Sequence, residues 1–342
     1  MITKFKFLKM NLLYPLKFKP IILDKMWGGS KLKTELNKPV ESDKAGESWE
    51  ISGFKGYISE VKNGFLAGNN LQELIEVYMG DLVGDRVYNK FGVEFPLLIK
   101  FIEANDVLSI QVHPGDELAK KRHNEMGKTE MWYIMQADER AELIVGFNRE
   151  VSKDIYLKHL DEKRLMSILN TEPVKEGDVF FLPAGRVHAI GSGILLAEIQ
   201  QTSDLTYRIY DFDRKDSDGN YRELHTEEAV EAIDYNYYKN YKTGYKDLEN
   251  KPVTLINCQY FTTNWLNVST KLDRDISQLD SFVIYLCIEG ACEIVQVNQD
   301  ATALQKGNTI LIPATLDQYT IIPRANVKLL EVFVTKESDD RE

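Results

Sequence analysis

The chain has 342 residues, of which 43% are hydrophobic and 28% are charged, as in an ordinary globular protein with two or three packed units. Its 42 basic and 53 acidic residues give a formal charge of −11. This charge argues against nucleic acid or an anionic membrane as the main partner, because both require a basic surface.

The amino-terminal segment carries no recognisable targeting signal. Lysines interrupt the apolar residues between Met1 and Leu13, so the segment lacks the apolar core of about 7–15 residues that a signal peptide needs. Met10 is a second candidate for the start of translation. No stretch approaches the ~18 apolar residues of a membrane span, and the three cysteines show no CxxC spacing. We therefore expect a cytoplasmic protein with free thiols.

The first of two strand-rich stretches in the chain predicts a β-rich region that helices interrupt. Its strand-like runs are short, rich in Val, Ile, Phe and Tyr, and bounded by Gly, Pro, Asn or Asp. The predicted strands are Phe95–Ile102, Val107–Val112, Met131–Met135, Ala141–Val145, Asp178–Leu182 and Leu195–Ile199. Apolar residues at one-face spacing predict helices at Leu71–Met79, Asp116–Glu125, Lys153–Leu169 and Thr226–Ala232, the last opening with a capping-box pattern.

The carboxyl-terminal part of the chain predicts a second set of strands. These are Thr262–Val268, Phe282–Ile288, Cys292–Val297, Thr309–Ile312 and Lys328–Val334. Short strands at such regular spacing are typical of antiparallel sandwiches or barrels.

An internal repeat links the two sets of strands. Gly177-Asp178, Pro183-Ala184 and His188 recur at identical spacing as Gly307-Asn308, Pro313-Ala314 and Gln318. Upstream, Tyr133 can be matched to Tyr285, which places Glu130 opposite Phe282. We interpret this as one hairpin architecture that occurs twice and keeps its polar candidates only in the first copy. Coincidence between two sets of hairpin turns is the alternative.

Polar side chains alternate along one predicted strand. In a strand, alternate residues share a face, so Ser109, Gln111 and His113 point the same way, while Ile110 and Val112 cover the other face. Polar groups on an otherwise buried strand are costly unless something satisfies them.

A metal ion would satisfy them. Glu130 begins the next strand, and His188 follows the first Pro-Ala turn. Two imidazoles and a carboxylate suit Zn²⁺, with Gln111 as a rarer fourth ligand. For His113 alone, a hydrogen-bonded core histidine is the competing interpretation.

These residues lie within a series of segments that resembles the short bacterial form of the type I mannose-6-phosphate isomerases. The matching segments are Pro15–Phe18, Trp27–Gly29, Gly46–Glu50, Pro96–Lys100, Leu108–Pro114, Gly127–Tyr133, Gly185–Ile190, Glu198–Asp204 and Tyr207–Arg208. They cover residues 15–214 in order and almost without interruption.

The resemblance implies a mainly β fold of two cupin, jelly-roll-like barrels with helical insertions. Residues 1–250 would form the catalytic cupin domain, with N-terminal strands and the helical insertions, and residues 251–342 a degenerate cupin. It also implies one Zn²⁺ per chain, with a catalytic arginine at Arg208. The implied zinc ligands are Gln111, His113, Glu130 and His188. The family interconverts mannose 6-phosphate and fructose 6-phosphate through an enediol.

An acidic protein needs local cations to bind a sugar phosphate. Arg208 suits a charge partner for developing oxyanions, with a salt bridge to Asp204 or Asp211 as the structural alternative. Lys128 is expected to project to the side of Glu130 and to take part in phosphate binding, ring opening or proton transfer.

Three assignments are more open. Lys100 and Ser109 are phosphate candidates, and Lys100 could instead be a surface charge. Glu198 is a candidate base, if burial tunes its pKa toward neutrality. A zinc-bound hydroxide is the alternative base.

Two other functions compete with the isomerase. One is a metal-dependent cupin oxygenase, in which the Lys128 and Arg208 cluster would have no role. The other is a non-catalytic cupin that senses sugar phosphates. We expect a monomer, because no long amphipathic seam can be read.

Overall fold

The computed structural model describes residues 13–216, 219–297 and 300–335. The candidate start at Met10 lies outside these ranges. Within them the chain forms strands β1–β21, helices α1–α7 and one 3-10 helix, η1. No helix in the described part of the chain is long and apolar enough to cross a membrane.

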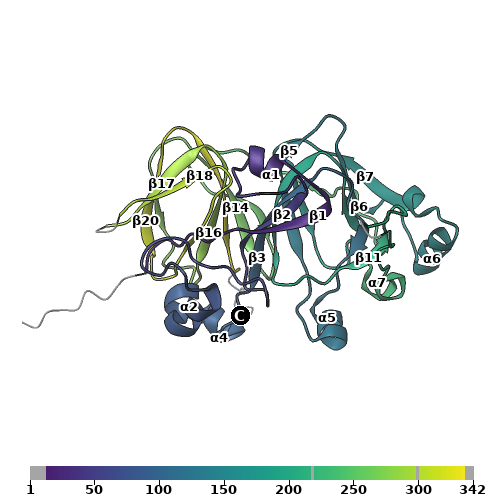
Figure 1. Ribbon diagram of the computed structural model, residues 1–342, viewed down its shortest axis with the longest axis horizontal. Helices are drawn as coiled ribbons and strands as arrows, with labels where there is room; N and C mark the ends of the chain where they lie inside the picture. The colour runs from purple at the N-terminus through teal and green to yellow at the C-terminus, as the bar shows by residue number, and fades with distance from the viewer. Residues whose placement is uncertain (1–12, 217–218, 298–299, 336–342) are drawn as a thin grey trace, which may run out of the picture.

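The strands form two β-sandwiches, each made of two antiparallel sheets (Figure 1). The first sandwich has a seven-stranded sheet in the order β1 (Ile21–Gly29), β2 (Ala45–Ile51), β3 (Leu97–Ala104), β10 (Ile194–Gln201), β5 (Glu130–Ala137), β8 (Val179–Leu182) and β12 (Lys242–Thr243). Its second sheet has the order β11 (Tyr207–Tyr210), β4 (Ile110–Val112), β9 (His188–Ile190), β6 (Glu142–Phe147) and β7 (Leu169–Pro173).

The second sandwich follows the same plan with shorter sheets. Its inner sheet has the order β13 (Val253–Asn257), β14 (Thr262–Val268), β21 (Val327–Phe333), β16 (Val283–Glu289) and β19 (Thr309–Ile312). Its outer sheet has the order β15 (Leu272–Asp275), β20 (Gln318–Pro323), β17 (Ala291–Val295) and β18 (Thr302–Gln305). The expected pair of jelly-roll-like domains is confirmed, although the sheets do not close into hydrogen-bonded barrels.

The four sheets stack as layers, with an apolar core in each gap. The largest core joins the two sandwiches through their larger sheets, and there Tyr133 stacks on Trp265 with ring centroids 5.3 Å apart. Separate cores fill the interior of each sandwich. The strands of the middle layers are buried on both faces, which explains why β10 and β16 read as nearly continuous apolar runs.

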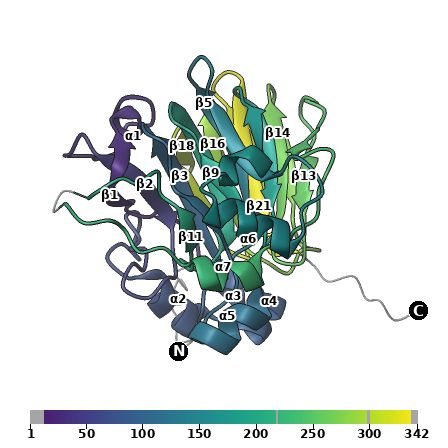
Figure 2. The same cartoon turned by 90° about the vertical axis from the view of Figure 1, so that its right-hand side faces the viewer.

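Helices cover the ends of this stack. Their bounds are α1 (Lys31–Thr34), α2 (Leu71–Tyr78), α3 (Gly80–Val83), α4 (Asp85–Phe91), α5 (Asp116–His123), α6 (Lys153–Asp161), η1 (Leu165–Ile168) and α7 (Thr226–Ala232). A core beneath α6, η1 and α7 covers the outer sheet of the first sandwich, and Figure 2 views the molecule from that side. At α2 the Asn70 side chain accepts a hydrogen bond from the backbone N–H of Glu73, whose carboxylate accepts one in return.

Two helix predictions need correction. The predicted helix Lys153–Leu169 is split, because Lys163 adopts φ 56° and ends α6, after which η1 leads into β7. Helix α7 has the predicted bounds, but it begins after His225 without a side-chain cap, so the capping box at Thr226 is not formed.

The internal repeat is also present in the structure, shifted by one residue at its upstream end. The Ile134 N–H donates to the Asp178 carbonyl, and the Cys287 N–H donates to the Asn308 carbonyl. Ile134 therefore corresponds to Cys287, and Glu130 corresponds to Val283 and not to Phe282. The register predicted from the two tyrosines was wrong because it matched similar side chains and not hydrogen-bonded positions.

Segments from the first 84 residues help to build the second sandwich. Leu16 and Leu311 exchange backbone hydrogen bonds of 2.8 and 2.9 Å. The Phe282 and Ala314 N–H groups donate to the carbonyls of Val83 and Leu82 in α3. Backbone hydrogen bonds from Leu16 to a strand of the second sandwich, and from the second sandwich to α3, thus connect the first part of the chain to the second sandwich.

Candidate active site

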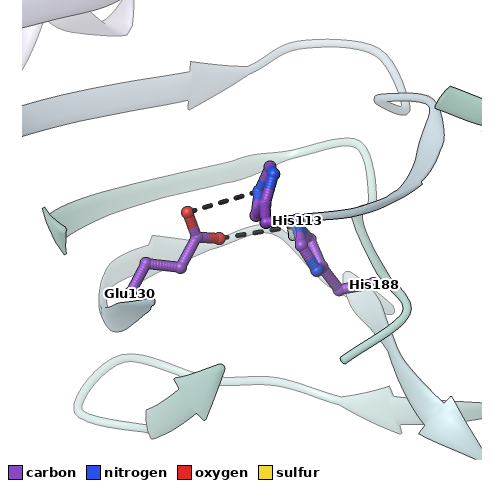
Figure 3. Close-up of side chains that lie close together, drawn as sticks. All are labelled: His113, Glu130 and His188. Carbon is purple, nitrogen blue, oxygen red and sulfur yellow. Dashed lines mark ion pairs between the residues drawn. The ribbon is translucent and has the colours of Figure 1, made fainter. Parts of the chain in front are cut away.

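Three buried side chains meet inside the first sandwich. Glu130 begins β5 on the seven-stranded sheet, whereas His188 begins β9 on the facing sheet. His113 follows β4, whose Gln111 is paired with His188. Figure 3 shows the Glu130 carboxylate directed at both imidazole rings. In the described part of the chain this is the only cluster of three or more His, Cys, Asp or Glu side chains that could hold a metal ion.

Both imidazoles are oriented by backbone carbonyls. The Nδ1 atom of His113 lies 2.7 Å from the Leu205 carbonyl, and that of His188 lies 2.9 Å from the Arg186 carbonyl. Each ring therefore donates through Nδ1 and presents the lone pair of Nε2 to the centre. The Nε2 atoms lie 3.5 and 3.4 Å from the two oxygens of Glu130.

The protonation states suit a metal site. Burial lowers the pKa of His188 to about 4 and that of His113 well below its usual value, so both rings are neutral near pH 7. Burial and the charge of Glu198 raise the pKa of Glu130. Both oxygens of Glu130 and Nε2 of His113 are buried without a hydrogen-bond partner. Unpartnered donor atoms of these types converging on one point fit a bound cation.

Gln111 completes the group at its edge. Its Nε2 lies 3.2 Å from Nε2 of His188, and its Oε1 lies 3.4 Å from the Ser109 hydroxyl. The side chains of Ser109 and Gln111 thus share a face, while Ile110 and Val112 are fully buried on the other.

A cavity of about 280 Å³ opens beside this cluster. Its lining residues are Lys25, Trp27, Glu47, Lys100, Ile102, Leu108, Ser109, Gln111, Lys128, Trp132, Ile190, Glu198, Asp204, Thr206, Arg208 and Arg222. The Lys128 ammonium lies 3.1 Å from Glu130 and so joins the cavity to the cluster. Polar, charged walls of this kind suit a hydrophilic anion.

Glu198 and Lys100 form an ion pair on the cavity wall. Their charged atoms are 3.2 Å apart, and the Trp132 indole N–H donates to the second oxygen of Glu198 at 2.9 Å. Burial acts to raise the pKa of Glu198, but Lys100 and Lys128 outweigh it and lower the pKa. The expected shift toward neutrality was therefore wrong in direction, because the sequence did not show how many cations surround this carboxylate.

Arg208 faces the cavity without a carboxylate partner. Its Nη1 donates to the Glu223 carbonyl at 2.8 Å, its Nε is buried and unpartnered, and no described carboxylate forms an ion pair with it. The alternative of a salt bridge to Asp204 or Asp211 is not observed, since Asp211 binds Arg214 and Arg222.

The sequence analysis did not identify Glu47 as a site residue, whereas Trp27 and Trp49 were candidates for the wall of the site. Glu47 forms ion pairs with Lys25 at 3.0 Å and Lys100 at 3.9 Å, and its pKa falls to about 2 because these cations outweigh burial. Two glutamates in the Gly46–Glu50 segment were the available signal. Trp27 lines the cavity, whereas Trp49 lies beneath Lys100, 5.0 Å from its ammonium.

The second sandwich contains a different buried cluster. Glu198 pairs with Trp132 across the first inner sheet, and in the same register Glu331 pairs with Tyr285 across the second. Glu331 is fully buried, and Arg274, Tyr285 and Asn264 donate to it at 2.6–2.9 Å. The second copy thus has Val283 and Gln318 at the positions of Glu130 and His188, but it keeps a buried carboxylate, Glu331, at the position of Glu198.

Comparison with known proteins agrees with this arrangement. Residues 16–148 match the family model for the type I phosphomannose isomerase catalytic domain, and residues 251–330 match the mannose-6-phosphate isomerase cupin domain. Mannose-6-phosphate isomerase ManA of Bacillus subtilis is 36% identical over 313 residues, covering 90% of this chain and 95% of that protein. Mannose-6-phosphate isomerase of Streptococcus mutans is 36% identical over 296 residues, covering 86% and 91%.

A solved structure extends the likeness to three dimensions. The crystal structure of the mannose 6-phosphate isomerase from Bacillus subtilis superposes with a TM-score of 0.84 at 31% identity, covering 94% of this chain and 99% of that one.

Proposed function

The chain belongs to the type I phosphomannose isomerase family, and we propose how its cavity performs that reaction. It is an aldose–ketose isomerase that interconverts mannose 6-phosphate and fructose 6-phosphate, and it uses a metal cofactor. The observation that carries the proposal is the buried His113, Glu130 and His188 cluster beside a cavity lined by five cationic side chains.

We propose that the metal is Zn²⁺, one per chain, held by Gln111, His113, Glu130 and His188. Two neutral imidazoles and a carboxylate are ligands that zinc prefers, and Gln111 can present its oxygen by rotating its amide. When bound there, zinc supplies a Lewis acid for the hydroxyl and carbonyl oxygens of the sugar.

The proton transfer is assigned to Glu198. Its carboxylate is ionised at neutral pH, because Lys100 and Lys128 lower its pKa. It removes the proton from C2 of open-chain mannose 6-phosphate and delivers it to C1 of the enediol, while the hydroxyl proton of O2 passes to O1, so that C2 becomes the carbonyl carbon of fructose 6-phosphate. The Lys100 and Trp132 contacts orient the carboxylate for this role.

Arg208 and Lys128 stabilise charge on the sugar oxygens. The guanidinium of Arg208 has no competing carboxylate, so it can follow negative charge as it develops on O1 and O2. Lys128 can donate to a sugar hydroxyl and promote ring opening. Ser109 stays a candidate donor to the substrate. Lys100 lies between Glu47 and Glu198, which favours orienting Glu198 over binding phosphate.

We further propose a monomer in the reducing cytoplasm, with a domain boundary at residues 250/251. All three cysteines are free, as a reducing compartment would keep them. The boundary follows the change from β12 to β13, where the second sandwich begins.

A coupled assay of mannose 6-phosphate turnover tests the proposal. The protein is assayed as purified, after chelation, and after Zn²⁺ or Fe²⁺ is restored, with metal content measured each time. We expect activity to vanish on chelation and return with zinc. A folded, metal-loaded protein that binds the sugar phosphate without turnover would instead be a sensing cupin.

A further inference from the structure

Cationic side chains outnumber carboxylates in the lining of the cavity. Five cationic side chains line it, from Lys25, Lys100, Lys128, Arg208 and Arg222, against three carboxylates, from Glu47, Glu198 and Asp204. Two further carboxylates lie directly behind the lining, because Glu130 pairs with Lys128 and Asp211 pairs with Arg222. How each cation is paired therefore decides where an anion such as a phosphomonoester can bind.

The lysines and the arginines of the cavity differ in how their charges are paired. Each of the three lysines forms an ion pair: Lys25 with Glu47 at 3.0 Å, Lys100 with Glu198 at 3.2 Å, and Lys128 with Glu130 at 3.1 Å. The two arginines differ, since Arg208 has no carboxylate partner in the described chain and Arg222 shares one carboxylate with a third arginine. A dianion placed beside Lys100 would also meet Glu47 and Glu198.

Arg222 is held in position from behind. Its Nε donates to Asp211 Oδ2 at 2.7 Å, and Arg214 donates to Asp211 Oδ1 at 2.7 Å. Arg214 also forms an ion pair with Asp106 at 3.6 Å. The Arg222 side chain is only 23% exposed, and both its Nε and its Nη2 donate to Asp211, so its guanidinium is oriented before any ligand arrives. The remaining edge of the guanidinium, formed by Nη1 and the second N–H of Nη2, suits two parallel hydrogen bonds to phosphate oxygens.

Arg208 and Arg222 are neighbours through the chain segment that follows Arg222. The carbonyl of Glu223 accepts from Arg208, and the His225 N–H donates to the Arg208 carbonyl. The two guanidiniums are close enough that Arg222 lowers the pKa of Arg208, after burial, the main cause. The segment from Arg222 to His225 thus sets the distance between the guanidinium groups of Arg208 and Arg222.

Resting on the isomerase function proposed above, we propose that Arg222 binds the 6-phosphate and sets the preference for phosphorylated hexoses. Asp211 and Arg214 are positioning residues for it. Arg208 then faces C1 and C2, while Arg222 anchors the other end of the open chain.

The test compares ligands with and without phosphate. Binding of the unreactive glucitol 6-phosphate and of inorganic phosphate is measured by calorimetry in the zinc-loaded wild type, in Arg222→Gln and in Arg324→Gln. Arg324 is a matched control, because it is an exposed arginine paired with Glu293 on the second sandwich. Loss of a charged hydrogen-bond pair should weaken glucitol 6-phosphate binding roughly 10- to 100-fold in Arg222→Gln only.

Kinetics separate binding from a structural role. The KM for mannose 6-phosphate should rise by a similar factor in Arg222→Gln, with kcat within about twofold of wild type. Arg222→Lys keeps the ion pair to Asp211, so its KM should lie between those of the wild type and Arg222→Gln. Unchanged binding, or a fall in kcat without a rise in KM, would overturn the assignment. Wild-type binding that Arg222→Gln loses, in a protein without turnover, would sink the isomerase proposal but leave the phosphate site standing.

Discussion

The two sandwiches treat a buried carboxylate in opposite ways. In the second, Glu331 receives hydrogen bonds from Arg274, Tyr285 and Asn264 and needs nothing further. In the first, the Lys128 ammonium lies 3.1 Å from one oxygen of Glu130, while the other oxygen and Nε2 of His113 lack a hydrogen-bond partner. The same architecture therefore gives one buried carboxylate whose hydrogen bonds come entirely from the protein and one that lies beside unpaired donor atoms.

This difference shows how one architecture can use a buried carboxylate for stability in one copy and for chemistry in the other. A buried charge is costly unless it is paired, and a protein cation can pair it as well as a metal can. In the second sandwich Arg274 pairs with Glu331. In the first, Lys128 pairs with one oxygen of Glu130, and the unpaired Nε2 of His113 beside it leaves room for a metal ion as well.

The largest effect should come from His188→Ala, which breaks the first interior. We expect the zinc to be lost, and turnover to fall on the order of a thousandfold or more, because a Lewis acid contributes several kcal/mol. Gln318→Ala is the matched control, since Gln318 stands at the equivalent place in the repeat and is exposed. Metal content and turnover of both variants are measured together. An active, zinc-loaded His188→Ala protein would contradict the ligand assignment.

Removing the cation that pairs with Glu331 in the second sandwich should lower the stability of the protein and leave turnover unchanged. Arg274→Gln leaves Glu331 buried without its cation, so we expect the free energy of unfolding to fall by about 3–5 kcal/mol. Turnover per folded molecule should stay at the wild-type level. Denaturant unfolding of this variant is compared with Arg274→Leu/Glu331→Leu, which should recover much of the loss. Equal instability of the single and double variants would argue against charge compensation.

Replacement of Arg208 in the first sandwich should lower turnover and leave stability unchanged, which is the reverse of the result expected for Arg274. In Arg208→Gln, zinc content and unfolding should match the wild type, while turnover falls by roughly two orders of magnitude or more. The reason is that Arg208, in the role proposed for it, pairs with charge on the reacting sugar, since it has no carboxylate partner in the described part of the chain. A near-normal rate, or a lowered unfolding free energy, would place Arg208 in the same class as Arg274.

The smallest predicted effect concerns Glu47, a buried carboxylate of the first sandwich that is paired by lysines. Glu47 is compensated by Lys100 and Lys25, so its pKa is lowered to about 2 from an ordinary 4.5. A lowered pKa gives stability that is present above about pH 4.5 and lost as the pH falls toward 2. We expect Glu47 to account for about 2 kcal/mol of the stability lost between about pH 5 and pH 3.

Acid titration of unfolding for Glu47→Gln and wild type checks this value. The variant should be less stable at neutral pH and should lose less stability on acidification. Parallel curves would show that Glu47 is not compensated in the way proposed.

The sequence predicted most strands and the metal cluster because both depend on short-range patterns. Period-two alternation placed Ser109 and Gln111 on one face, the strand start and the Pro-Ala turn indicated Glu130 and His188, and the family resemblance implied the same ligands. Residues that act through long-range pairing were harder to find. Glu47 contacts Lys100 only because β2 pairs with β3, and Arg222 is held at the cavity wall by its hydrogen bond to Asp211.

Glu331 had a readable signal that the sequence analysis did not use. A single glutamate interrupts the apolar run Leu329–Val334, and a charge in a strand buried on both faces requires a partner. The partner, Arg274, could not be identified, because β15 and β21 lie in different sheets. The shifted register had the same origin, since hydrogen-bond pairing and side-chain likeness disagree by one residue at Tyr285.

The pairing of Leu16 with Leu311 has a consequence for how the protein is made. The two residues are about 300 positions apart, and a ribosome adds roughly 5–20 residues per second. Leu16 therefore emerges about 15–60 s before its partner exists. During that time the backbone groups of Leu16 lack their partner strand and are open to incorrect pairing with other nascent chains. Final assembly of this enzyme must wait until Leu311 has been made.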